Sequence, residues 1–237
     1  IGAGMRPGTV PSKDPQKPLI EPLERYGVKL MSIGFLVDTT TPMVWRGPMI
    51  ASAAMQLLKD VAWGELDYLI VDLPPGTGDV QLTIAQQVLV AGAVVVSTPQ
   101  DVALADVVRA KVMFDRVSIP VLGIVENMSW FVCDNCNKRH EIFFHGGAKS
   151  AARNMGVPFL GEVPIEPGVV SGGDRGKPVV RDVPDSASAQ AFFTIARATA
   201  TAVAKLAFDQ REAFAAPTVT ITGGSIRGSG DKGAKKG

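Results

Sequence analysis

The chain has 237 residues, 46% of them hydrophobic and 20% charged, which suits one sizeable α/β domain with tails. A net charge of +1 gives no reason to expect nucleic acid or an anionic membrane surface as a partner. The two cysteines exclude a disulfide framework and favour a reducing intracellular compartment. No apolar run reaches the roughly 18 residues of a membrane span, so we expect no membrane partner.

The first 27 residues are rich in proline and glycine, which predicts an irregular, largely extended lead-in over residues 1–27. A strand is expected from Val28 to Val37, with the sequence VKLMSIGFLV. A helix is expected from Pro48 to about Val61, because proline suits the first turn of a helix and apolar residues follow at helical spacing.

The stretch IVDLPPGTGD, residues 70–79, is the most informative in the chain. Leu69 to Val71 form a continuous apolar run, the pattern of a strand buried on both faces of a parallel sheet. The run ends in Asp72 and then in a Pro-Pro-Gly turn, which can continue neither strand nor helix. A helix is expected from Val80 to Leu89.

Further strands and helices alternate along the rest of the chain. Strands are expected at 92–98, 121–125 and 159–163, and helices at 102–117, about 148–155 and about 186–209. Such alternation predicts right-handed crossovers and an α/β fold with a doubly wound, mostly parallel sheet. The expected domain covers residues 28–210, and the Gly- and Lys-rich residues 211–237 are expected to form a disordered tail.

The carboxylate after the 69–71 run would lie at the carboxyl edge of such a sheet, where ligands bind in open α/β folds. Asp72 suits a magnesium–phosphate site, because it can hold the ion through its water shell. Gly76 and Gly78 allow backbone N–H groups to approach a phosphate, and Thr77 and Asp79 are good helix caps. The simpler interpretation is a tight turn with a solvated acid.

The only cysteines, Cys133 and Cys136, form a C-x-x-C, and the only histidines, His140 and His145, follow shortly after. All four could close around one zinc ion within a chain. A redox C-x-x-C is a second interpretation, although that motif normally opens a helix. The third is half of a metal site, because an iron–sulfur cluster typically takes four thiolates and two chains can supply them.

Several strings in this chain, among them DLPPGTGD, MSIGFLV, WRGPM and ENMS, resemble the Mrp/Nbp-type P-loop ATPases. These are iron–sulfur cluster carriers related to MinD and include a mitochondrial relative that serves respiratory complex I. The resemblance covers about residues 25–195. It implies a P-loop NTPase-like fold in which Asp72 is catalytic and Gly76, Thr77, Gly78 and Asp79 contact nucleotide. It also implies that Asn127, in the ENMS string, faces the adenine.

The resemblance favours the half-site interpretation of the cysteines. In the family a Cys-x-x-Cys pair after ENMS joins a [4Fe–4S] cluster across a homodimer, usually with proline after the first cysteine. In this sequence Asp134 occupies the position of that proline, and both cysteine ligands, Cys133 and Cys136, are present. The implied function is to bind this cluster and transfer it to apo iron–sulfur proteins, in the mitochondrial matrix or a bacterial-type cytoplasm. The alternatives are a MinD/ParA-like partitioning ATPase and a non-enzymatic, zinc-stabilised binding module.

A phosphate-binding loop of the form G-x-x-x-x-G-K-[ST] is absent from this sequence. The only Gly-Lys dipeptide, Gly176-Lys177, is followed by Pro178. In the resembled family the loop belongs to the first strand–loop–helix unit, which we expect to be missing here. ATP and Mg²⁺ are therefore expected as ligands only if that N-terminal part is present, and the 237-residue chain is not expected to hydrolyse ATP alone.

Overall fold

The computed structural model describes residues 6–12, 14, 16–37, 47–73 and 79–215, and the side chains of these residues except 47–48, 79–80 and 210–215. The chain divides into two compact units, Ile1–Val203 and Ala204–Gly237. The division predicted from the sequence, 1–27, 28–210 and 211–237, remains a prediction.

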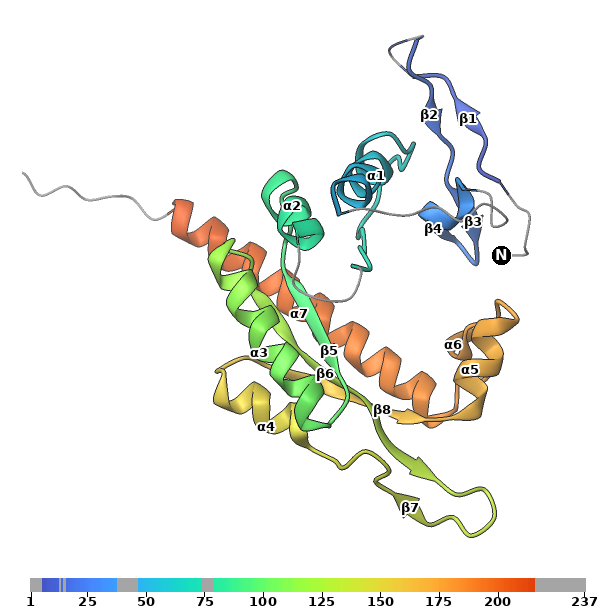
Figure 1. Cartoon of the computed structure of the whole chain (residues 1–237), viewed down its shortest axis with the longest axis vertical. Helices are drawn as coiled ribbons and strands as arrows, with labels where there is room; N and C mark the ends of the chain where they lie inside the picture. Colours follow the sequence, from blue (N-terminus) through green and yellow to red (C-terminus); the bar gives the residue numbers. More distant parts are fainter. Residues whose placement is uncertain (1–5, 13, 15, 38–46, 74–78, 216–237) are drawn as a thin grey trace, which may run out of the picture. The chain divides into compact units, whose positions relative to one another are not determined.

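The first unit contains a mostly parallel sheet (Figure 1). Its middle strand, β6 (Val121–Val132), pairs in parallel with β5 (Ala93–Ser97) and with β8 (Phe159–Ile165). The short β7 (Arg139–His140) pairs antiparallel with the last two residues of β6. The predicted α/β class with a mostly parallel sheet is confirmed.

Helices cover both faces of this sheet. Strand residues alternate between faces, so Ile124 and Val125 enter different cores. On one face, Ile124 packs with buried residues of α3 (Asp101–Arg116) and α4 (Gly147–Asn154). On the other face, Val125 packs with side chains of α7 (Ala187–Ala215). This two-sided cover explains the continuous apolar run of β6, whereas β5 is covered on one face only, with Val94 and Val96 exposed on the other.

The sequence placed most of these elements to within a few residues. The predicted helices near 48–61 and 80–89 correspond to α1 (Gly47–Lys59) and α2 (Asp79–Gln87). Two short helices, α5 (Pro167–Asp174) and α6 (Val179–Asp182), were not predicted. Strand β6 continues to Val132, where an end at Val125 was predicted.

The strand predicted from Val28 to Val37 is wrong beyond its first three residues. Only β4 (Val28–Leu30) forms, paired antiparallel with β3 (Leu23–Arg25). A 3₁₀ turn, η1 (Ile33–Phe35), then begins where the side chain of Ser32 accepts the N–H of Gly34 at 3.2 Å. A serine that caps a turn in this way competes with strand pairing. Upstream, β1 (Thr9–Val10) and β2 (Leu19–Ile20) pair within the predicted irregular lead-in.

The predicted buried strand at 69–71 is also wrong for this structure. Leu69, Ile70 and Val71 belong to no strand and are exposed, Ile70 by 90%. The apolar pattern identifies a segment suited to burial, but a strand also needs a neighbour that supplies hydrogen bonds. Among the described strands, β5 and β8 pair with β6, and none pairs with residues 69–71.

Helix α7 is unusually apolar. The segment Ala187–Asp209 is long and apolar enough to cross a membrane by length and composition alone. However, Ala191, Ile195 and Ala198 pack against the sheet core, as expected for a helix that covers a sheet. One such helix is weak evidence for a membrane span, and we retain the expectation of no membrane partner.

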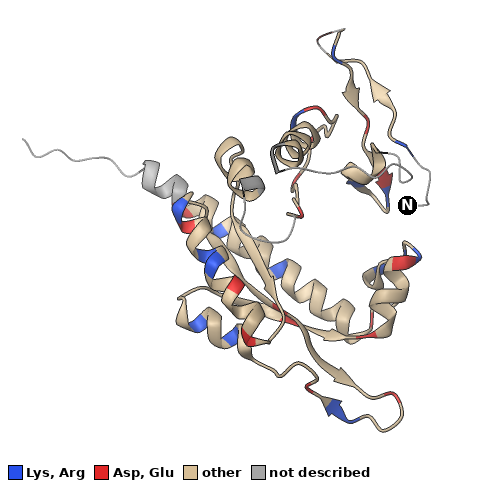
Figure 2. Ribbon diagram, in the orientation of Figure 1, with Lys and Arg blue, Asp and Glu red and all other residues tan. Residues whose placement is uncertain are grey.

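Charged side chains of both signs are interspersed along α3, whereas α4 carries only the basic residues Lys149 and Arg153 (Figure 2). On α3, Arg109 pairs with Asp106 at 2.8 Å and Lys111 pairs with Asp115 at 2.6 Å, each within one helical turn. Exposed pairs of this kind contribute little to stability, but they keep opposite charges mixed on the helix surface. Such mixing agrees with the expectation of no nucleic-acid partner, which stays a prediction.

Candidate metal centre

The outer half of β6 extends beyond the end of β5 and forms, with β7, a hairpin that carries both cysteines. We call residues 127–146 the thiol arm. Its two limbs are joined by the pairs Phe131–His140 and Val132–Arg139. Between the two limbs, the guanidinium carbon of Arg139 lies 4.9 Å from the centre of the Trp130 ring, which is a cation–π contact. These contacts hold the hairpin together without a large core.

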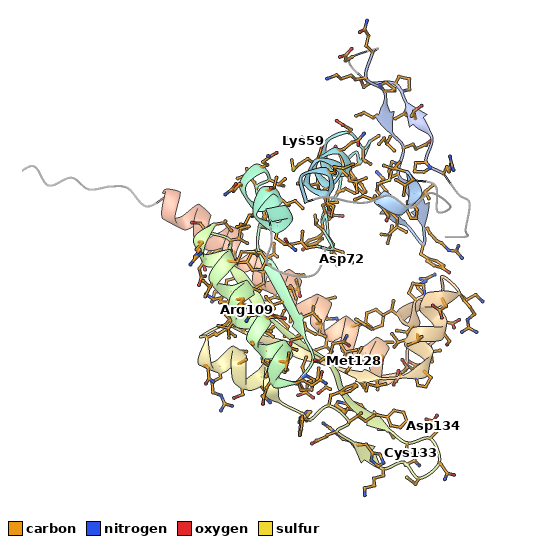
Figure 3. The ribbon with its side chains drawn as sticks, viewed as in Figure 1. Lys59, Asp72, Arg109, Met128, Cys133 and Asp134 are labelled. Carbon is orange, nitrogen blue, oxygen red and sulfur yellow. The ribbon has the colours of Figure 1, made fainter. Side chains whose placement is uncertain are left out.

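The turn at the end of the arm is closed by backbone hydrogen bonds around Cys133. The N–H of Cys133 donates to the carbonyl of Lys138 at 3.0 Å, and the N–H of Asn137 donates to the carbonyl of Cys133 at 2.8 Å. Asn137 has a φ of +54°, a left-handed conformation that asparagine tolerates well. Figure 3 shows Cys133 and Asp134 at this outer end.

The same turn lowers the pKa of the Cys133 thiol below its ordinary value. The largest cause is the backbone N–H of Cys136 directed at the Cys133 sulfur, followed by the N–H of Asn135 and the thiol of Cys136. Desolvation and the carboxylate of Asp134 oppose this shift. A thiolate is the form that binds metal, so a turn that donates N–H groups to sulfur fits a metal-ligand role. Cys133 is partly buried and Cys136 is exposed, and both are free.

The structure does not assemble the Cys₂His₂ site that the sequence left open. Nε2 of His145 lies 3.0 Å from Oε2 of Glu162, on β8, and its Nδ1 lies 3.8 Å from Glu141. His140 pairs with Phe131 through the β7 backbone and is exposed. Within the described part of the chain, no three His, Cys, Asp or Glu side chains gather as a metal site would require. The zinc alternative therefore has no geometric support.

A buried carboxylate fixes the base of the thiol arm. Glu126 is fully buried and is the last residue of β6 that pairs with β5. Its Oε1 accepts the hydroxyl of Ser129 at 2.6 Å and the N–H of Gly146 at 2.9 Å, and its Oε2 accepts the N–H of Ala148 at 2.8 Å. A carboxylate at this position satisfies N–H groups at the start of α4 and interacts favourably with the helix dipole. Both ends of the arm are thus tied to one side chain.

Two glycines allow the end of the thiol arm to approach Glu126 and the sheet closely. Gly146 has a φ of +80°, a left-handed conformation that favours glycine. At Gly147 a Cβ atom would collide with the carbonyl oxygen of Pro99, just after β5. The role of Glu126 was not predicted from the sequence. The adjacent glycines at the start of the predicted helix could have indicated that two backbone segments pack closely there.

The predicted nucleotide-binding residues are only partly described. Asp72 is exposed and lies outside any helix or strand (Figure 3). Gly76, Thr77 and Gly78 lie outside the described residues, and Asp79 is the first residue of α2. The roles predicted for these residues therefore remain predictions.

Asn127 was predicted just past a strand end and instead lies within β6. Its side-chain oxygen accepts the N–H of Met128 at 3.0 Å, and Met128 has a φ of +56°. The strand register shifts between Asn127 and Phe131, so this pair marks a kink in β6. The adenine contact predicted for Asn127 stays a prediction.

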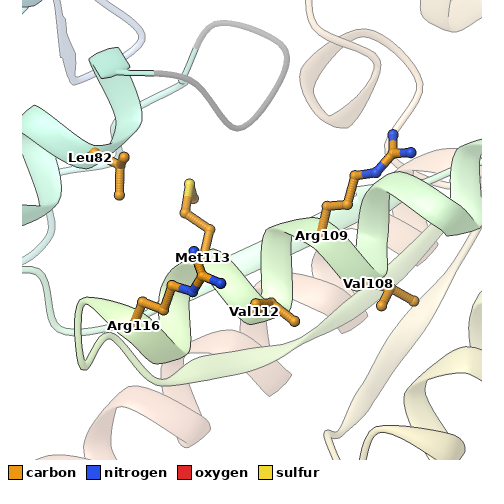
Figure 4. A pocket seen from close by; sticks show the side chains of 6 residues that line it. All are labelled: Leu82, Val108, Arg109, Val112, Met113 and Arg116. Atoms are coloured by element: carbon orange, nitrogen blue, oxygen red, sulfur yellow. The ribbon is translucent and has the colours of Figure 1, made fainter.

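A cavity of about 350 Å³ lies elsewhere, between α2 and α3. Its lining is aliphatic except for Arg109 and Arg116 (Figure 4). It includes none of the residues singled out from the sequence. Nothing in this lining connects the cavity to metal chemistry.

The family is decided by comparison with known proteins. The family model for ParA, described as the NUBPL iron-transfer P-loop NTPase, matches residues 6–200. The chain belongs to this family. A protein of Dictyostelium discoideum named iron–sulfur cluster transfer protein NUBPL is 48% identical over 201 residues, which cover 85% of this chain and 62% of that protein. An Aquifex aeolicus protein named iron–sulfur cluster carrier protein is 50% identical over 179 residues, or 75% of this chain and 49% of that one.

One solved structure supports the fold assignment. The nucleotide-binding protein of Archaeoglobus fulgidus, in complex with ADP, superposes with a TM-score of 0.57 at 43% identity. The match covers 67% of this chain and 62% of that one. The P-loop NTPase-like fold predicted from the sequence is confirmed. The chain spans 62% or less of the length of the curated relatives quoted above, so the activity of a whole family member is not thereby established for it.

Proposed function

We propose that this chain carries an iron–sulfur cluster on Cys133 and Cys136 and delivers it to apo-proteins. The observation that carries the proposal is the turn at the end of the thiol arm, where two free thiols are exposed or partly buried and backbone N–H groups favour the thiolate of Cys133. Thiolate ligands select iron–sulfur clusters and zinc. Family membership and the names of the relatives favour the cluster.

The cluster would be held between two copies of the chain. One chain has two cysteines, whereas an all-thiolate [4Fe–4S] cluster takes four. A homodimer supplies four by placing two thiol arms together. A cluster shared at an exposed edge is easier to release than one enclosed in a core, and release is what a carrier needs. The cluster is the cargo, and apo iron–sulfur proteins are its recipients.

Nucleotide would regulate this transfer in a polypeptide that also contains a phosphate-binding loop. In that setting Asp72 would bind the magnesium shell, and Gly76, Thr77, Gly78 and Asp79 would lie near the phosphates. Asn127 would contact the base, and because it is the first residue of the thiol arm, that contact and the two cysteines belong to one short segment of the chain. We also propose a reducing compartment, since the free thiols require it and a similar Arabidopsis thaliana protein is named as mitochondrial.

The partitioning ATPase is the weaker alternative, because such a protein would not need a C-x-x-C turn. The matching family model describes iron transfer, and the relatives quoted above are named for iron–sulfur clusters.

Delivery of the cluster tests the proposal directly. The chain is reconstituted anaerobically with iron and sulfide and then mixed with the apo form of an enzyme whose activity requires a [4Fe–4S] cluster. We expect activity to appear, and to appear even with a chelator that captures free iron. The same protocol with Cys133→Ser or Cys136→Ser should give none. Activation that survives both substitutions, or that the chelator abolishes, would contradict the proposal.

A further inference from the structure

One aromatic residue of the thiol arm has both a strained backbone conformation and an exposed side chain. Phe144 has a φ of +68° and is 76% exposed. The left-handed conformation is costly for a bulky residue, and exposure leaves a large apolar surface in water. Residues held in sparsely populated conformations tend to cluster at functional sites.

The backbone on both sides of Phe144 is fixed by interactions already described for the arm. His145 pairs with Glu162 at 3.0 Å, and the N–H of Gly146 is held by Glu126. The N–H of Phe144 itself donates to the carbonyl of Glu141 at 3.2 Å. Anchors on each side therefore hold the ring outward.

Two further exposed apolar side chains belong to the same arm, Ile142 and Met128. The return segment starts at His140, which pairs with Phe131, and ends at Gly146, which is bonded to Glu126. It therefore runs back along the outer half of β6, where Met128 lies (Figure 3). We call Met128, Ile142 and Phe144 the apolar patch of the arm.

We propose that the apolar patch is the surface on which a second copy of this chain packs when a cluster is bound. The inference rests on the proposed function. A chain with two thiols cannot complete a four-thiolate cluster, so a second pair must come close to Cys133 and Cys136. Residues of the arm must then touch the partner, and its exposed apolar side chains gain most from that contact. In a two-fold dimer the same patch serves on both copies.

The test compares Phe144→Gly and Ile142→Ser with Val102→Ser. Glycine at position 144 removes the ring and relieves the backbone, so this variant should fold at least as well as the wild type. Val102 is 83% exposed on α3, outside the arm, and provides the control. Each variant is reconstituted with iron and sulfide, and its mass is followed by light scattering during dilution. Amide hydrogen exchange of residues 140–146 is measured before and after reconstitution.

We expect the wild type and Val102→Ser to dimerise with equal affinity, and the two patch variants about tenfold or more weakly, as for truncation of buried interface anchors. Exchange over residues 140–146 should slow when the wild type dimerises. Equal dimer affinity in all four proteins would overturn this inference while leaving the proposed function intact. If the patch variants dimerise as tightly as the wild type but deliver the cluster more slowly to the apo-enzyme, the inference would also be overturned, and the patch would instead be a contact surface for the recipient protein. A wild type that binds no cluster would contradict the proposed function itself.

Discussion

Oε2 of Glu126 accepts the backbone N–H of Ala148 at 2.8 Å, so the strand that carries the thiol arm outward also holds the helix that follows the arm. The carboxylate is fully buried and accepts two further hydrogen bonds. Both ends of the arm are therefore anchored to the same side chain, and the arm is not a free loop.

Replacing Glu126 should destabilise the fold and loosen the arm. Glu126→Ala leaves the N–H groups of Gly146 and Ala148 without this acceptor, and we expect a loss of about 2–4 kcal/mol in the free energy of unfolding. Glu126→Gln keeps one acceptor oxygen and should lose less. Urea denaturation measures both, with Asp106→Ala, an exposed carboxylate on α3, as the control. A Glu126→Ala protein as stable as this control would contradict the anchoring role.

The pKa of Cys133 should respond to Asp134. The carboxylate of Asp134 raises this pKa against the larger lowering effect of the turn N–H groups, so Asp134→Asn should lower it further. The pH at half-maximal iodoacetamide alkylation reports it, measured in a Cys136→Ser background so that one thiol reacts. We expect that midpoint to lie lower in the folded chain than in urea, and to fall again with Asp134→Asn.

The matched control for this titration is Glu141→Gln, which removes another carboxylate from the arm. Glu141 is not among the causes of the Cys133 shift. Because the folded pKa is lowered, the thiolate persists to lower pH in the folded chain, and its contribution to stability is lost as the pH falls through that value. Midpoints that match those in urea would show that the turn does not act on the sulfur.

The 237-residue chain should not hydrolyse ATP. It has no G-x-x-x-x-G-K-[ST] loop, which supplies most phosphate contacts and a charge-stabilising lysine in P-loop enzymes. Phosphate release at millimolar ATP with Mg²⁺ should stay at the level of buffer, and Asp72→Asn should not change it. A rate that disappears with Asp72→Asn would reveal a working site and reject this prediction.

The histidines should be dispensable for metal binding. His145 is engaged with Glu162 rather than directed at the thiols, and His140 belongs to no metal-like group among the described residues. The double variant His140→Ala, His145→Ala should therefore keep the iron content of the wild type after reconstitution. Loss of the exposed His145–Glu162 pair should cost little stability. One zinc per monomer, lost with either histidine, would restore the zinc alternative.

Much of the sheet could be predicted from the sequence because its strands are apolar runs that pack against helices, on both faces of β6 and on one face of β5. Segments 92–98 and 159–163 are apolar runs between helical patterns, and they form β5 and β8 close to those limits. The run at 69–71 has the same pattern but is exposed, since pairing depends on a neighbour that local sequence does not reveal. Likewise, Ser32 ends the strand predicted at 28–37 by capping a turn.

The two candidate metal ligands could be singled out from the sequence, but their structural setting could not. Cys133 and Cys136 stand out as the only cysteines. The support from Glu126, the kink at Met128 and the strained Phe144 arise from long-range contacts and backbone conformation, which composition and periodicity do not encode. The extension of β6 to Val132 depends on pairing with the end of β8 and with the two residues of β7, which is too short a strand to recognise from its pattern.

The most direct test of a shared cluster is the ratio of iron to chain, measured together with mass. After anaerobic reconstitution with iron and sulfide, we expect about four irons per two chains and a shift from monomer to dimer, because each chain contributes two thiolates. Cys133→Ser and Cys136→Ser should each abolish the iron and the dimer together. A wild type that stays monomeric while holding metal, or that dimerises equally without iron and with either cysteine replaced, would contradict this account.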